Sequence, residues 1–127
     1  MTHDLNIWAA WIGVLSGVLT GIWHGLHFHD IGWLGGYASW KRRLMRLGHI
    51  SFFGIAILNL AFAWTIRDLH WRPDTLIPSI SLAAAQVLMP LVCYLAAWRG
   101  AMRRLFFLPV SCVLIAICGL LWSRAVP

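Results

Sequence analysis

Residues 5–28 read LNIWAAWIGVLSGVLTGIWHGLHF, a stretch that contains no Asp, Glu, Lys or Arg. A helix needs about 20 predominantly apolar residues to cross the hydrocarbon core of a bilayer, and this stretch is long enough. A polypeptide in lipid must also pair its backbone groups within its own segment, which a helix does. The stretch therefore predicts a membrane-spanning helix near the N-terminus.

Three further stretches, at residues 47–66, 75–98 and 105–123, likewise lack charged residues. Of the 127 residues, 61% are hydrophobic and only 11% are charged. A soluble domain carries about a quarter charged residues, so a soluble globule is excluded. We predict an all-α membrane protein in which residues 1–127 form one domain of four transmembrane helices in an antiparallel up-down bundle. An aromatic and glycine-rich segment at about 30–45 is expected to lie along the membrane interface.

Basic residues are distributed unevenly between the predicted connections. The first and third connections hold seven of the ten: Lys41, Arg42, Arg43, Arg46, Arg99, Arg103 and Arg104. The other three are Arg67, Arg72 and Arg124. Cytoplasmic loops of membrane proteins carry the excess of Lys and Arg. We therefore predict that loops one and three are cytoplasmic, that both termini lie outside (N-out/C-out), and that the membrane is a bacterial inner membrane.

Glycine recurs at every fourth position of the first span, on one side of the helix: Gly13, Gly17, Gly21 and Gly25. Because glycine lacks a Cβ, such a side lets a second helix or a flat ligand approach the backbone. The opposite side is expected to face lipid through Leu15, Leu19, Ile22 and Leu26. In the last span, the small and polar residues are expected to face the bundle interior: Ser111, Cys112, Cys118, Gly119 and Ser123.

Three histidines, His24, His27 and His49, lie near the predicted cytoplasmic ends of the first two spans. An ionisable side chain inside a membrane is costly unless it is paired, so it indicates a functional site. Histidines on facing helices of a bundle are suitable axial ligands for haem. We predict a site for haem b, with His49 and either His24 or His27 as ligands. The predicted function is that of a small subunit or partner of a membrane electron-transfer complex.

Two other interpretations stay open. In one, the protein is a small metal carrier or permease whose site combines the histidines with two cysteines: His24, His27, His49, Cys93 and Cys112. In the other, it is a cofactor-free structural or assembly subunit that docks partner helices through the four glycines. The histidines would then form hydrogen bonds between helices, for example from His49 to Thr20. Asn59 and Gln86, in the middle of their spans, are expected to form such hydrogen bonds in either case.

The sequence offers little else for catalysis. It contains no Glu, and no Asp lies within a predicted span. It also lacks the nucleophile and nucleotide-binding motifs of common enzymes. We therefore predict no catalytic residues. The expected partners are the lipid bilayer and either other membrane subunits or a second copy of the chain, and nucleic acid is not expected to bind.

Overall fold

The computed structural model describes residues 2–68 and 75–125, without the side chains of residues 2, 3, 124 and 125. Its four long helices are α1 (Thr2–His27), α2 (Trp40–Asp68), α3 (Leu76–Trp98) and α4 (Phe107–Ala125). Two short 3-10 helices, η1 (Trp33–Gly35) and η2 (Gly100–Phe106), lie in the α1–α2 and α3–α4 connections. Arg72 and the Arg124 side chain lie outside the described residues.

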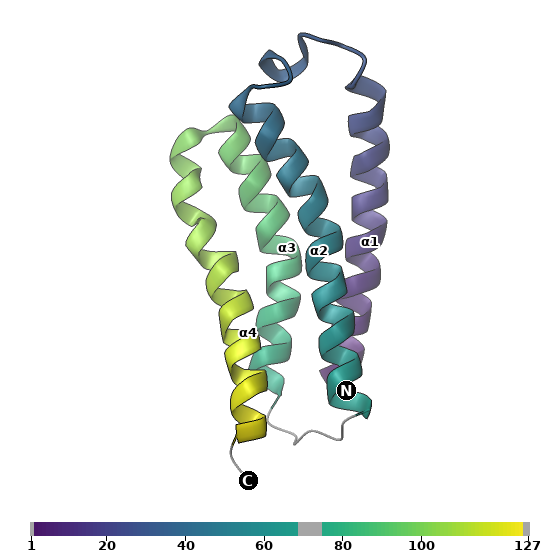
Figure 1. Cartoon of the computed structure of the whole chain (residues 1–127), viewed down its shortest axis with the longest axis vertical. Coiled ribbons are helices and arrows are strands. Elements are labelled where there is room, and N and C mark those ends of the chain that lie inside the picture. The colour runs from purple at the N-terminus through teal and green to yellow at the C-terminus, as the bar shows by residue number, and fades with distance from the viewer. Residues whose placement is uncertain (1, 69–74, 126–127) are drawn as a thin grey trace.

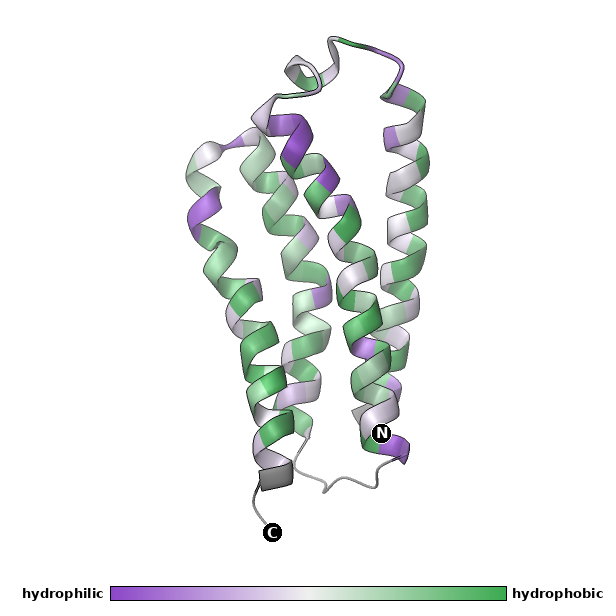
Figure 2. Ribbon diagram, in the orientation of Figure 1, coloured by the Kyte–Doolittle hydropathy of each residue, from purple (hydrophilic) through white to green (hydrophobic). Residues whose placement is uncertain are grey.

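All four long helices are long and apolar enough to cross a membrane, which confirms the all-helical fold class. Figure 2 shows hydrophobic residues along each of them, with hydrophilic residues at both ends of α2 and in η2. The four aliphatic residues expected on the lipid side of α1 are indeed 57–66% exposed: Leu15, Leu19, Ile22 and Leu26. The outward side of α1 is therefore apolar, as contact with a bilayer requires.

Helices α1, α2 and α3 pack against one another, whereas α4 packs chiefly along α3, on the side away from α1 (Figure 1). One apolar cluster joins Phe62, Leu82 and Ala116 of α2, α3 and α4. In the most apolar part of α3, 44% of the residues are buried, compared with 11% for α4. The core is therefore a three-helix unit with α4 added at its edge.

Helix α2 begins at Trp40, seven residues before the predicted span. The last six residues of the segment expected to be an interfacial loop, at about 30–45, are thus helical. The Ser39 hydroxyl accepts a hydrogen bond from the Arg42 backbone N–H, 3.2 Å away, and so caps the helix. Leu44 and Met45 then pack against α3. The basic residues form the first turns of a helix that has one buried side, and only residues 28–39 connect α1 to α2.

The buried side of α4 also differs from the prediction. Pro109 and Ala116 are buried, whereas Ser111 and Cys118 are exposed; Cys112, Gly119 and Ser123 are half-buried. Small apolar residues can pack closely on α3, and in an apolar surrounding a lone hydroxyl or thiol gains little from facing inwards. The expectation that Ser111 and Cys118 face the interior is therefore wrong.

Candidate functional site

The glycine side of α1 packs within the chain. A Cβ at Gly17 would lie 2.7 Å from Cζ of Phe53, and one at Gly21 would lie 2.8 Å from Cε1 of His49. Gly13 lies directly against the Gln86 side chain, and only Gly25 has nothing within 4 Å of an added Cβ. The hollows beside three of the four glycines are therefore filled by side chains of α2 and α3.

His24 and His49 meet across the contact between α1 and α2. Their ring centroids lie 5.5 Å apart, with an angle of 77° between the ring planes. His24 is only 2% exposed, and its Nε2 is buried without a hydrogen-bond partner. His49 Nδ1 lies 3.3 Å from the Thr20 hydroxyl, as expected for a histidine that forms an interhelix hydrogen bond. The pair thus contains one imidazole with a polar partner and one whose buried nitrogen has none.

His27 lies apart from this pair. Its Nδ1 lies 2.8 Å from the Trp23 carbonyl oxygen, to which it can donate within the same helix. Its ring stacks on Trp33, with 5.4 Å between centroids and 23° between planes. Of the two histidines that the sequence offered as partners of His49, the structure places His24 opposite it.

The cysteines do not complete a metal site with these histidines. Cys93 is fully buried in α3. It lies against Gly48 of α2, the residue before His49. Cys112 is half-buried on α4, the helix at the edge of the core. Within residues 2–68 and 75–125, no three or more His, Cys, Asp or Glu side chains are grouped so that they could hold a metal ion.

Aromatic rings surround His24. Its ring centroid lies 5.9 Å from that of Trp33, 6.2 Å from that of Tyr94 and 6.4 Å from that of Phe28. The Tyr94 hydroxyl is also buried. It lies beside Thr20, but no neighbouring group meets it with the geometry of a hydrogen bond. Buried polar groups in folded proteins nearly always have partners, so unpaired atoms at one place indicate a ligand or water site.

A second polar cluster occupies the opposite half of the three-helix core, and all its hydrogen-bonding side chains are buried: Asn6, Asn59, Ser79 and Gln86. Asn6 Nδ2 donates to Asn59 Oδ1 at 2.7 Å, and the Ser79 hydroxyl donates to Asn6 Oδ1. Gln86 Nε2 donates to the Phe52 carbonyl oxygen at 2.9 Å. These bonds confirm the interhelix role predicted for Asn59 and Gln86.

Sequence reasoning missed Asn6 in this cluster. Asn6 lies seven residues before Gly13, on the same side of α1, and this spacing is the signal that could have identified it. The cluster's side chains bond one another and backbone carbonyls of α2 and α3, which fits a structural role. The cluster lies away from His24, and its side chains are hydrogen-bonded, unlike the unpaired atoms around His24.

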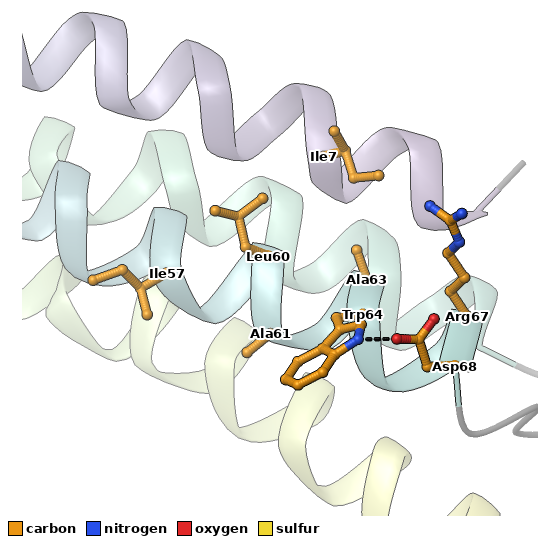
Figure 3. Close-up of a pocket in the computed structure, with 8 residues that line it drawn as sticks. All are labelled: Ile7, Ile57, Leu60, Ala61, Ala63, Trp64, Arg67 and Asp68. Carbon is orange, nitrogen blue, oxygen red and sulfur yellow. Dashed lines mark hydrogen bonds between the residues drawn. The ribbon is translucent and has the colours of Figure 1, made fainter.

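A groove of about 640 Å³ lies between α1 and α2, at the end of α2 far from His24 and His49 (Figure 3). Its lining is mainly aliphatic, and at its edge the Trp64 indole N–H donates to the Asp68 carboxylate on the same helix. Among the described side chains, no histidine or cysteine lines it. The groove therefore does not belong to the candidate site.

The chain matches no protein-family model, no curated protein and no solved structure. A function must therefore be argued from the site itself. The relevant observations are the His24–His49 pair, the buried nitrogen without a partner and the aromatic surroundings.

Proposed function

We propose that this protein is a small integral membrane protein that binds haem b through His24 and His49, as a subunit or partner of a membrane electron-transfer complex. The observation that carries the proposal is the His24 Nε2, which is buried without a partner opposite His49. An imidazole nitrogen in that situation is available as a metal ligand.

Haem suits this ligand set better than a bare metal ion. Zinc sites in proteins take three or four side-chain ligands. Among the described side chains, no group of three candidates is present. A porphyrin brings its own four in-plane nitrogens and needs only axial ligands from the protein. When bound, haem supplies a one-electron redox couple, and the imidazoles tune its potential.

The residues fit haem as ligands, and space for the macrocycle depends on side-chain movement. His49 and Phe53 fill the hollows beside Gly21 and Gly17. A macrocycle between the two imidazoles therefore requires these two side chains to move away from α1. Both side chains belong to α2, at its contact with α1.

The proposal includes an orientation. The helices form an antiparallel bundle across a bacterial inner membrane, with the α1–α2 and α3–α4 connections in the cytoplasm and both termini outside. Both connections lie at the same end of the molecule (Figure 1). Seven basic residues lie at that end. Four are in the first turns of α2, two are in η2, and Arg99 comes directly before η2. The excess of Lys and Arg supports a cytoplasmic location, and the His24–His49 pair then lies in the cytoplasmic half of the membrane.

The test is an absorption spectrum of the protein purified in mild detergent from cells supplied with a haem precursor. We expect a Soret band that is lost in the His24→Ala and His49→Ala variants. His27→Ala is the matched control and should keep the band, because His27 bonds its own helix and stacks on Trp33. A folded, colourless wild-type protein would overturn the proposal, and so would equal loss of the band in all three variants.

The filled glycine hollows favour a second candidate, a cofactor-free structural or assembly subunit. In that case the His49–Thr20 bond serves packing only. Docking of partner helices would use a surface other than the side with Gly13, Gly17 and Gly21, since that side is covered within the chain. A folded, colourless protein that co-purifies with membrane subunits would support this candidate.

A further inference from the structure

Arg42 is a buried cation beside the α1–α2 connection. It lies in the first turn of α2 and is only 4% exposed. Its Nη2 donates to the Phe28 carbonyl oxygen at 3.2 Å, where α1 ends. Its guanidinium carbon lies 5.4 Å from the Phe28 ring centroid and 5.5 Å from that of Trp33. The side chain therefore ties α2 to the connecting segment.

These contacts leave the guanidinium incompletely satisfied. The Arg42 Nε is buried and has no hydrogen-bond partner. The only acid in the connecting segment, Asp30, uses its Oδ1 to accept from the Gly32 backbone N–H. Aromatic rings attract a cation through their faces but do not accept the Nε–H as a carboxylate or phosphate oxygen does. An anionic oxygen is the group that this environment lacks.

A second guanidinium contacts the same ring as the first. Arg42 and Arg46 both approach the Tyr37 ring, with guanidinium carbons 5.5 Å and 4.5 Å from its centroid. No carboxylate pairs with either of them among the described side chains. Two like charges at one ring repel each other, and an anion between or beside them removes that repulsion. The Tyr37 and Phe28 rings are 70% and 47% exposed, so the site adjoins the molecular surface.

We propose that Arg42 and Arg46 form a specific site for the phosphate of an anionic phospholipid at this end of the protein. Exposed Trp40 and Trp98 at the same end are typical of the headgroup level of a bilayer, where phosphodiester oxygens are abundant. Arginine binds phosphate with several N–H groups at once. The site does not rest on the haem proposal, since it uses neither histidine.

The experiment uses the full chain in detergent, with equal amounts of phosphatidylglycerol and phosphatidylcholine added, and measures the retained lipids by native mass spectrometry. We expect the wild type to retain phosphatidylglycerol preferentially. Arg42→Gln should weaken that retention by about tenfold, as expected for loss of a charge-assisted bond. Arg43→Gln is the matched control, because Arg43 is exposed on the same helical turn and the charge change is identical. An arm with inorganic phosphate as competitor separates the sources: displacement of the lipid by phosphate alone would assign the site to free phosphate.

Equal losses in Arg42→Gln and Arg43→Gln would overturn the proposal in favour of general basic attraction. So would a wild type without preference between the two lipids. Arg46→Gln covers the case in which Arg42→Gln does not fold, as judged by circular dichroism. Arg46 is only half-buried, and its variant is also expected to lose retention relative to Arg43→Gln. Retention equal to that of Arg43→Gln would then overturn the proposal.

Discussion

The contact between Gly17 and Phe53 gives the sharpest stability prediction. In Gly17→Ala the new Cβ would lie 2.7 Å from Cζ of Phe53. Carbon atoms normally approach to about 3.5–4.0 Å, so the ring must move by about 1 Å. Overpacking of this kind costs about 1–3 kcal/mol. Phe53 also packs against His49, with 5.4 Å between ring centroids, which limits where the ring can go.

Gly25→Ala is the control on the same helix, because nothing lies within 4 Å of its added Cβ. Gly17 lies in the middle of α1 and Gly25 in its last turn, so the gain in helix propensity, up to about 1 kcal/mol, is at least as large for Gly17→Ala and cannot cause a lower stability of that variant. We therefore expect Gly17→Ala to be less stable than Gly25→Ala by about 1–3 kcal/mol. The measurement is equilibrium unfolding in mixed detergent micelles with increasing SDS, followed by tryptophan fluorescence.

A double-mutant cycle locates the cause of the effect. Phe53→Leu shortens the side chain that meets the new methyl group, so Gly17→Ala should cost less in that background. Equal unfolding midpoints for Gly17→Ala and Gly25→Ala would refute the reasoning. An undiminished cost of Gly17→Ala in the Phe53→Leu background would also refute it, because the clash would then lie elsewhere.

Three further predictions follow from the packing and the charge distribution. Asn6→Ala and Asn59→Ala should each destabilise by about 1–3 kcal/mol because each breaks the buried hydrogen bond between the two amides. The double variant should lose less than the sum of the two, and additive losses would contradict the bond between them. Gly119→Ala should increase amide hydrogen exchange in α4, since the new Cβ would meet the rigid Pro78 ring of α3. Gly54→Ala is the control, because its Cβ would enter open space, and equal exchange of α4 in the two variants would contradict this packing. Alkaline phosphatase fused to the C-terminal end should be active in bacteria, and an inactive fusion would reverse the proposed orientation.

The helices were predictable because their cause is local. A bilayer requires a long uncharged stretch for each crossing, and four such stretches stand out in the sequence. The start of α2 was not predictable from hydropathy, because Lys41, Arg42 and Arg43 mask a helix whose buried side carries Leu44 and Met45. Its cap, Ser39, is the local signal for the true boundary.

The depth of a site residue was predicted, whereas its direction was left open. His24 and His27 lie at nearly the same depth. His24 lies seven residues after Gly17, on the side of α1 that faces α2, and this spacing is the signal that could have distinguished it from His27, which stacks on Trp33. Cys112 was expected to lie near the histidines on the assumption that all four helices line one interior. Helix α4 is apolar on every side, so hydropathy does not determine where it packs.

The position of α4 has a consequence for how the protein is made. Every side-chain hydrogen bond between helices described above joins α1, α2 and α3. During synthesis from the N-terminus, the partners of the buried amides and imidazoles are thus all present once the third helix has left the ribosome. The fourth helix then adds an apolar contact to a unit whose interhelix hydrogen bonds have already formed. A nascent chain arrested after α3 should accordingly be able to adopt its internal hydrogen bonds before the last segment is translated.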